Sequence, residues 1–221
     1  MHHTESNLIE IQNKIKSKID NLNLSSYKPK IIAVSKTFSE QDIIPLLHYG
    51  HNDFGENKVQ EAKKKWVKLK NDFKNVKLHM LGKLQTNKVK HAVEIFDYIH
   101  SLDNLKLASK LADEIKKKNK DIKIFIQVNL GGEKQKSGIE PSEIELFCQN
   151  CFSLDLKIVG TMCIPPDNED PKFFFNELSK LNQKLNLNEI SMGMTNDYLV
   201  ALEYNATFLR IGSGIFGERT K

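Results

Sequence analysis

Short apolar runs alternate with longer amphipathic segments along almost the whole chain, and few folds are open to a chain built this way. The apolar runs predict strands at residues 30–35, 52–54, 77–81, 98–101, 122–129, 156–160, 189–192 and 207–210. The amphipathic segments predict helices at residues 5–22, 40–49, 58–71, 87–95, 105–118, 141–150, 172–185 and 197–204. Because strands that alternate with helices form parallel sheets with helical crossovers, the pattern predicts an α/β fold.

The number of units favours a closed barrel over an open doubly wound sheet. Eight predicted strands, each with a helix beside it, are typical of a (β/α)8 TIM barrel. No GxGxxG motif follows the first strand, as it would in a dinucleotide-binding doubly wound sheet. Such barrels routinely occupy roughly 200–250 residues, so we expect one domain over residues 1–221, with 5–22 as an extra N-terminal helix.

Composition excludes several classes of protein. Apolar residues make up 39% of the chain and charged residues 28%, which is enough to bury a core and unlike a disordered or fibrous sequence. The net charge of +5 is spread over lysine-rich helices without interleaved aromatic residues, so we expect solvated helix faces and no nucleic-acid partner. No segment approaches the ~20 apolar residues of a membrane span, and the polar N-terminus lacks a signal core. We expect a cytoplasmic protein without a membrane partner.

The three cysteines, Cys148, Cys151 and Cys163, are an odd number in a long chain, which favours a reducing compartment over a disulfide framework. Cys148 and Cys151 have CxxC spacing, but no second CxxC or nearby histidine pair accompanies them. We therefore expect buried helix thiols and no metal site.

Unusual residues gather where the predicted strands end. Lys36 follows the first strand, and the segments that follow other strands are FGEN (54–57), HMLGKLQTNK (79–88), QVNLGGEKQKSG (127–138), SMGMTND (191–197) and LRIGSGIFG (209–217). The carboxyl ends of barrel strands all lie on one face, which carries the active sites of such barrels. The sequence therefore predicts one site built from these segments.

Lys36 is a candidate for Schiff-base chemistry. It leaves a β-branched run that reads as a fully buried strand, just before a predicted helix start, so it should face a cleft. The alternative is a solvated surface charge, because lysine and arginine together make up 33 of 221 residues.

The end of the chain predicts a phosphate site. Gly212 and Gly214, separated by Ser213, allow the backbone to approach an anion, and the N–H groups of a short helix opening there would point at it. Thr195 can add a hydroxyl from the neighbouring loop. A plain turn is the alternative reading of Gly-Ser-Gly.

A lysine and a phosphate anchor at one barrel mouth point to pyridoxal 5′-phosphate. The ring nitrogen of this cofactor needs a carboxylate or arginine partner, and Arg210 lies two residues before the predicted phosphate loop. Since arginine cannot accept a proton, the ring would be a poor electron sink, which disfavours strong carbanion chemistry. A structural ion pair is the alternative role for Arg210.

Together these blocks make the chain resemble the pyridoxal phosphate homeostasis proteins, the YggS-like family with the fold of the alanine racemase N-terminal domain. The resemblance covers nearly all of residues 31–219. The blocks that carry it, in order, are AVSKT, FGENKVQE, HMLGKLQTNK, QVNLGGEKQKSG, GTMCIPP (160–166), SMGMTND and RIGSGIFGER.

The resemblance implies roles for individual residues. Lys36 would hold the cofactor as a Schiff base, Arg210 would face the pyridine nitrogen, and three residues would hold the phosphate, namely Thr195, Gly212 and Ser213. Asn57 and Met80 would line the pocket, with Met194 of the SMGMTND block as a further cofactor-binding residue. Lys136 matches a second family lysine near the site, although the sequence supports a solvated surface lysine nearly as well.

The resemblance also implies a function: binding the cofactor and influencing its intracellular supply, with no established catalytic turnover. Amino acids or apoenzymes that depend on the cofactor would be the acceptors, and the protein would be a monomer. The alternative is a PLP-dependent amino-acid racemase with the same barrel, which is called fold type III among PLP-dependent proteins. Alanine racemases, however, have a second β-domain and a tyrosine base from a partner subunit, and 221 residues leave no room for that domain. A sugar-phosphate barrel enzyme would not explain why a lysine and an arginine flank the phosphate loop.

Overall fold

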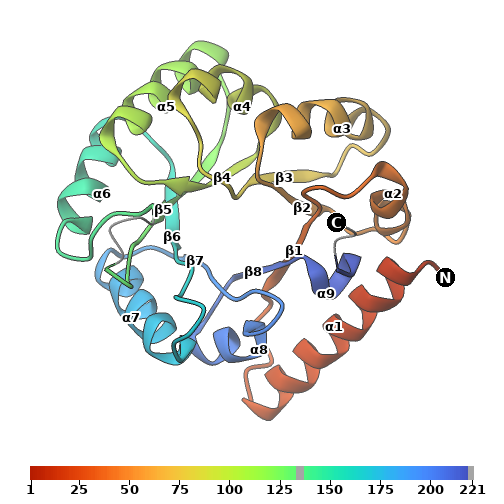
Figure 1. Ribbon diagram of the computed structural model, residues 1–221. Coiled ribbons are helices and arrows are strands. Elements are labelled where there is room, and N and C mark those ends of the chain that lie inside the picture. The colour runs from red at the N-terminus through yellow and green to blue at the C-terminus, as the bar shows by residue number, and fades with distance from the viewer. Residues whose placement is uncertain (133–136, 219–221) are drawn as a thin grey trace.

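The computed structural model describes residues 1–132 and 137–218, and its strands form a closed parallel barrel in sequence order (Figure 1). The strands are β1 Lys30–Val34, β2 Asp53–Glu56, β3 Lys77–Met80, β4 Tyr98–Leu102, β5 Lys123–Gln127, β6 Ile158–Met162, β7 Glu189–Ser191 and β8 Phe208–Ile211. β8 pairs with β1 and closes the ring, with Ala33 opposite Ile211. The predicted (β/α)8 barrel is confirmed.

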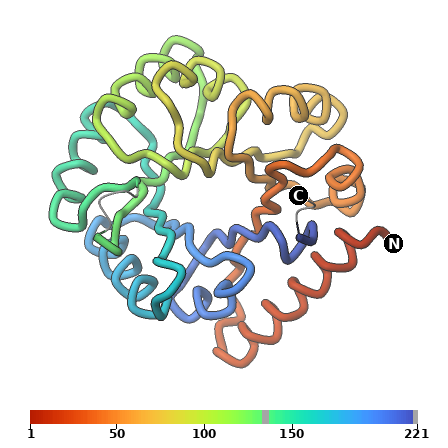
Figure 2. Tube along the Cα trace, viewed as in Figure 1, coloured from red at the N-terminus to blue at the C-terminus, as the bar shows by residue number. Residues whose placement is uncertain are grey.

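The helices form an outer ring around the barrel (Figure 2). They are α1 His3–Asn21, α2 Glu40–His48, α3 Val59–Asp72, α4 Val89–Ile95, α5 Leu105–Lys118, α6 Ile144–Ser153, α7 Pro171–Lys184, α8 Tyr198–Ala201 and α9 Ser213–Phe216, with 3-10 turns η1 Thr86–Lys88 and η2 Leu202–Tyr204. The extra helix α1 packs beside α9, so that the first and last helices lie together (Figure 1).

Local sequence signals set several helix boundaries. Asn104 caps α5, where its side-chain oxygen accepts a hydrogen bond from the Leu107 N–H at 2.8 Å. Asn119 ends the same helix in the left-handed conformation. At α7, Asp170 caps the helix and Pro171 occupies its first turn, where a missing N–H costs nothing.

Several element boundaries differ from the sequence prediction, most clearly on either side of the loop between α6 and β6. The helix expected from residue 141 begins at Ile144, after a turn. The sixth strand lies two residues later than expected, at Ile158–Met162. The reason is that Asp155 has a φ of 57° and the Leu156 N–H bonds back to the Cys151 carbonyl, so these residues close α6 instead of starting the strand.

Strand side chains alternate between two cores. Outward-facing residues such as Ile31 and Ala33 pack under the helices, and inward-facing residues fill the barrel. The buried apolar residues inside the barrel are Ile32, Val34, Tyr98, Phe125, Met162 and Phe208, and the partly buried Leu81 and Val159 pack against them. This alternation decides which residues at the strand ends reach the barrel mouth.

The cysteines are buried thiols, as predicted. Cys148 and Cys151 belong to the core beneath α6, and Cys163 follows β6. Burial raises the pKa of Cys148 to about 11 and those of Cys151 and Cys163 to about 12. Thiols in this state are poor nucleophiles and metal ligands.

None of the helices in the described ranges is both long and apolar enough to cross a membrane. Residues 1–132 and 137–218 also contain no group of three or more histidine, cysteine, aspartate or glutamate side chains placed to hold a metal ion.

Gly160 is a site where the barrel tolerates no side chain. A Cβ added there would lie 1.8 Å from the Glu189 carbonyl oxygen of the paired strand β7. We expect Gly160→Ala to lower the free energy of unfolding by about 3 kcal/mol or more, because backbone would have to move. Urea unfolding measures this.

Gly50→Ala is the matched control, since its Cβ would meet nothing within 4 Å although its φ is 93°. That change should cost only about 1–2 kcal/mol of backbone strain. Equal losses in the two variants would contradict the predicted clash.

Candidate cofactor site

A cavity of about 480 Å³ lies at the carboxyl ends of the strands. Its lining comprises Val34, Lys36, Asn57, Leu81, Met162, Ile164, Pro165, Pro166, Asp167, Glu169, Pro171, Met194, Thr195, Asn196, Asp197, Arg210, Gly212 and Ser213. Every predicted cofactor-binding residue except Met80 is among them. Residues far apart in the sequence therefore meet in one cavity, on the face that the sequence predicts.

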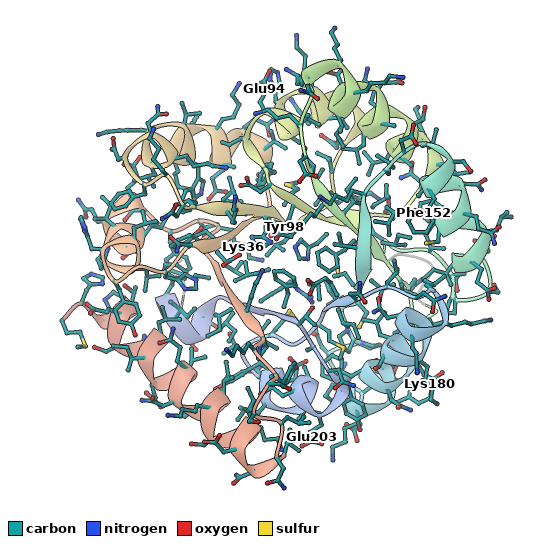
Figure 3. The ribbon with its side chains drawn as sticks, turned by 180° about the vertical axis from the view of Figure 1, so that it is seen from behind. Lys36, Glu94, Tyr98, Phe152, Lys180 and Glu203 are labelled. Carbon is teal, nitrogen blue, oxygen red and sulfur yellow. The ribbon has the colours of Figure 1, made fainter. Side chains whose placement is uncertain are left out.

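Lys36 reaches this cavity because of its place in the alternation of β1. Ile32 and Val34 point into the barrel, and Lys36 lies two residues beyond Val34 on the same side. Its side chain is half-buried. In Figure 3, Lys36 and Tyr98 lie toward the middle of the ring, whereas Glu94 and Lys180 lie at its periphery. The lysine thus faces the cavity and is not an ordinary surface charge.

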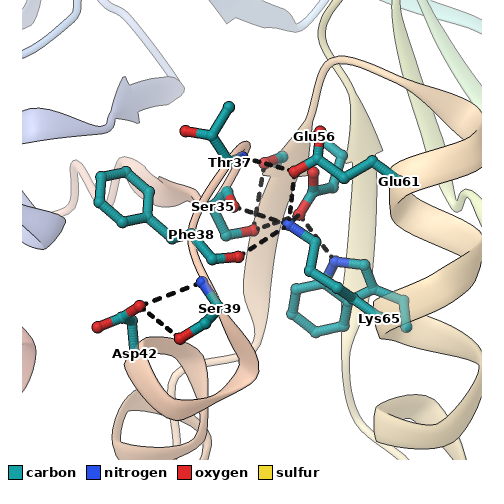
Figure 4. Close-up of polar contacts among 10 residues, drawn as sticks. Ser35, Thr37, Phe38, Ser39, Asp42, Glu56, Glu61 and Lys65 are labelled. Atoms are coloured by element: carbon teal, nitrogen blue, oxygen red, sulfur yellow. Dashed lines mark hydrogen bonds and ion pairs between the residues drawn. The ribbon is translucent and has the colours of Figure 1, made fainter. Parts of the chain in front are cut away.

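A buried polar cluster holds the chain just before Lys36 (Figure 4). Ser35 donates its N–H to the Gly55 carbonyl at 2.9 Å and its hydroxyl to Glu56 at 2.8 Å. Glu56 is fully buried and also accepts from the Trp66 indole at 3.0 Å. The ammonium of Lys65 lies 2.7 Å from the same carboxylate oxygen. Four groups therefore converge on the strand end that carries the lysine.

The chain just after Lys36 is held by the same cluster. Thr37 has a φ of 70°, which is a strained conformation for a β-branched residue. Its N–H donates to the Glu61 carboxylate, and Lys65 bridges Glu61 at 2.9 Å and the Phe38 carbonyl at 3.3 Å. Burial alone would raise the pKa of Glu61, but the hydrogen bonds from Lys65 and the Thr37 N–H outweigh burial and lower it. The cluster therefore maintains the turn at Lys36.

The predicted phosphate loop and its neighbour are joined by hydrogen bonds. The Ser213 hydroxyl donates to the Thr195 hydroxyl at 3.3 Å, and the Gly214 N–H donates to the same oxygen at 3.2 Å. A Cβ on Gly214 would crowd Thr195 at 3.1 Å, whereas a Cβ on Gly212 would meet nothing closer than 3.6 Å. Gly214 thus permits the close approach of the two loops. Gly212 leaves backbone open toward the cavity at the start of α9, where helix N–H groups have no intrahelical partners.

Arg210 lines the cavity from the inner face of β8 and is only 5% exposed. Its Nη1 donates to the Ser191 hydroxyl and its Nη2 to the Cys163 carbonyl, both at 2.8 Å. Burial lowers the pKa of Arg210, although the nearby Cys163 and Asp197 partly oppose this. No carboxylate of the described residues forms an ion pair with Arg210, so the structural ion pair considered from the sequence is absent there.

Met80 differs from its predicted place. Its side chain is 1% exposed and belongs to the outer core, because it points away from the barrel axis. The next residue, Leu81, faces inward and lines the cavity instead. The strand alternation contains this signal, because His79 on β3 also points inward. Lys136 lies outside the described residues.

Several residues that shape the site were not predicted. Ser191 and the Cys163 carbonyl hold Arg210, and Lys65 and Glu56 hold the turn at Lys36. Ser191 and Cys163 lie within motif blocks at strand ends. The motifs therefore predicted that both residues lie near the site, but not that they bind Arg210. Nothing in the sequence singles out Lys65 among the many lysines of its helix.

The fold places the protein in a known class. The family described as "Alanine racemase, N-terminal domain" matches residues 12–220. The alanine racemase of Clostridium difficile 630 aligns with a TM-score of 0.72 at 13% identity, covering 99% of this chain and 57% of the racemase. The barrel and its cavity thus define a protein with the fold of the alanine racemase N-terminal domain.

More similar proteins specify the family. PipY of Synechococcus elongatus PCC7942, solved with PLP bound, aligns with a TM-score of 0.81 at 32% identity, covering 92% of this chain and all 100% of PipY. Proteins named pyridoxal phosphate homeostasis protein are 38% identical over 200 residues in Aquifex aeolicus (86% of this chain, 87% of the relative) and 34% identical over 228 residues in Pasteurella multocida (97% of both). The chain belongs to this family of pyridoxal phosphate homeostasis proteins, which confirms the resemblance carried by its motifs.

The polar cluster beside Lys36 can be tested by removing its cation. Lys65→Met would leave the carboxylate of Glu56, which is fully buried, without a positive partner. We expect the free energy of unfolding in urea to fall by about 3–5 kcal/mol, as when one member of a buried ion pair is removed.

Lys63→Met is the matched control on the same helix, because Lys63 forms a largely exposed pair with Glu94 at 3.6 Å. It should cost no more than about 1 kcal/mol. If the two variants were equally stable, the cluster would not have the stabilising role described above.

Proposed function

We propose that this protein binds pyridoxal 5′-phosphate through Lys36 and acts in intracellular homeostasis of this cofactor, with no catalytic turnover of its own. One observation carries the proposal: Lys36, Arg210 and the Gly212–Ser213 loop line the same cavity. Membership in the pyridoxal phosphate homeostasis family and the PLP-bound structure of PipY support it.

The residues present fit the chemical groups of the cofactor. PLP supplies an aldehyde that condenses with a primary amine, with loss of water, and a phosphate that needs hydrogen-bond donors. Lys36 provides the amine, while the Ser213 and Thr195 hydroxyls and the backbone at Gly212 provide a polar cradle. Asn57 and Met194 complete the proposed pocket.

Arg210 supports a binding role over catalysis. Its guanidinium is held by two hydrogen bonds within the protein and would face the ring nitrogen. Arginine has no lone pair with which to accept a proton, and it stays protonated in proteins. It therefore leaves the ring nitrogen without an added proton, and the ring withdraws electrons only weakly from a bound amino acid.

Racemization is the second candidate, favoured by the shared fold with alanine racemase. A two-base racemase needs a second acid/base group opposite the lysine. The described residues that line the cavity include no tyrosine or histidine, and their carboxylates are Asp167, Glu169 and Asp197. A racemase reaction would therefore depend on one of these carboxylates as the second acid/base group.

The proposal extends to the domain organisation, oligomeric state and location of the protein and to the acceptors of the cofactor. We propose that residues 1–221 act as one cofactor-binding domain, as a monomer in the cytoplasm. Amino acids or PLP-dependent apoenzymes would take the cofactor from it, because their amines compete with Lys36 for the same aldehyde.

The lysine assignment predicts a specific covalent product. Wild-type protein incubated with equimolar PLP should show a visible absorption band, and borohydride followed by peptide mass mapping should place the reduced adduct on Lys36. In Lys36→Ala both the band and the adduct should fall to background.

Lys58→Ala is the control, because Lys58 is an exposed lysine beside Asn57 of the cavity. It should behave like the wild type. Pyridoxal, which lacks the phosphate, should load less completely than PLP. A full adduct on another residue in Lys36→Ala would overturn the assignment.

The absence of turnover is tested separately. PLP-loaded protein is incubated with L-alanine or L-serine in deuterated water, and Cα exchange and D-isomer are followed by NMR and chiral chromatography. We expect neither over several hours, because Arg210 would leave the ring of the cofactor a weak electron sink. Alanine racemase serves as the positive control, and sustained exchange by the wild type that disappears in Lys36→Ala would establish the racemase alternative.

A further inference from the structure

Four side chains inside the barrel form an unbroken hydrogen-bonded chain that ends at Arg210. Asp53 Oδ1 lies 3.0 Å from His79 Nε2, and His79 Nδ1 lies 3.0 Å from His100 Nε2. His100 Nδ1 lies 2.8 Å from Ser191 Oγ, which accepts from Arg210 at 2.8 Å. The two histidines and the serine are fully buried.

The donors in this chain can point only one way. The Asp53 carboxylate only accepts, so a neutral His79 donates to it from Nε2 and accepts on Nδ1. His100 then donates to His79 from Nε2 and accepts on Nδ1 from the Ser191 hydroxyl, whose oxygen also accepts from Arg210. With neutral imidazoles, both tautomers follow from the Asp53 end, where the carboxylate only accepts.

Charge and packing support neutral imidazoles in the middle. Burial lowers the pKa of His79 despite Asp53, and burial, His79 and Arg210 hold the pKa of His100 well below its usual range. The Tyr98 ring stacks on His79 at 4.3 Å and the Phe125 ring stacks on His100 at 4.2 Å. The imidazole planes are therefore fixed, with the positive charge at one end of the chain and the negative charge at the other.

The hydrogen-bonded chain of side chains from Asp53 to Arg210 spans the barrel. Arg210 lines the cofactor cavity, whereas Asp53, at the start of β2, lines a different hollow of about 560 Å³ at the amino-terminal ends of the strands. The second hollow also contains Lys30 and His51. A side chain that cannot touch the cofactor is thus connected to the one that would face its ring nitrogen.

We propose that Asp53, His79, His100 and Ser191 are positioning residues, which orient the Arg210 guanidinium and so tune the ring of bound PLP from the opposite end of the barrel. This rests on the proposed function. The hydrogen bond from Ser191 to His100 fixes the rotation of the hydroxyl and so turns a lone pair of its oxygen toward Arg210, and the orientation of each link therefore depends on the next. Replacement of Asp53 removes the acceptor and the charge that anchor the direction of the whole chain.

The test compares Asp53→Asn with Asp20→Asn in the full chain. Asp20 lines the same hollow but is exposed and lies outside the hydrogen-bonded chain. In PLP-loaded protein, Asp53→Asn should lower the pH midpoint of the visible band by about 0.5 unit or more, a threefold change in acid constant, because a balancing negative charge is lost. Asp20→Asn should leave the midpoint unchanged.

Ser191→Ala is the second variant, since it removes the direct acceptor of Arg210 with little change in volume. It should weaken PLP binding roughly tenfold, as expected for the loss of one hydrogen bond to a charged group. The groups around the chain that also titrate or carry charge are Lys30, His51, Asp97, Tyr98, Cys163 and Asp197. Midpoints are therefore compared between variants and not assigned to one residue.

A readout without cofactor separates this inference from the proposed function. Nitrogen-15 NMR of histidine-labelled, cofactor-free protein should show His79 and His100 neutral at pH 7 with the proton on Nε2, assigned with His→Gln variants. An imidazolium, or a neutral imidazole with its proton on Nδ1, at His79 or His100 of the wild type would contradict the proposed direction of the hydrogen bonds. Wild type that loads PLP on Lys36, with band and affinity unchanged in both Asp53→Asn and Ser191→Ala, would overturn the positioning role. Failure of the wild type to load PLP would overturn the proposed function, and the positioning role with it, while the NMR result would still stand.

Discussion

The pairing of β8 with β1 is the contact on which the site depends. It joins the two ends of the sheet, with Lys30 opposite Phe208 and Ala33 opposite Ile211. Lys36 and Gly212 leave these neighbouring strands at the same end and line one cavity, although almost the whole sequence separates them. An open sheet of the same strands would place the amine and the phosphate loop at opposite edges. Closure of the barrel therefore creates the site.

Two buried polar systems organise the site in different ways. The cluster around Glu56 and Lys65 holds the strained turn that contains Lys36. The chain from Asp53 to Arg210 runs through the middle of the barrel, where apolar residues would pack more cheaply. Buried polar groups cost free energy unless their hydrogen bonds are satisfied, and these side chains, except at the second carboxylate oxygen of Glu56, are hydrogen-bonded across different strands and helices. Each system holds one residue that would touch the cofactor.

Sequence reasoning located the strand ends, and all but one of the residues that it proposed for the cofactor line the cavity. The exception, Met80, shows its limit. A motif places a residue near a strand end, but a shift of one position moves a side chain from the cavity to the outer core. Met80 therefore lies in the outer core, whereas the next residue, Leu81, lines the cavity. The displaced start of β6 has a similar origin, because the left-handed Asp155 extends the end of α6.

The sequence by itself determined the repeated strand–helix order, the barrel, and the candidacy of Lys36, Arg210 and the Gly212–Ser213 loop. These properties are local: they follow from periodicity, from residue type and from position after a strand. Only the tertiary structure decided which groups surround them. That Ser191 and the Cys163 carbonyl hold Arg210, or that Lys65 reaches Glu56, depends on strand register and side-chain direction. Such partners come from distant parts of the chain, and burial within the closed barrel selects them.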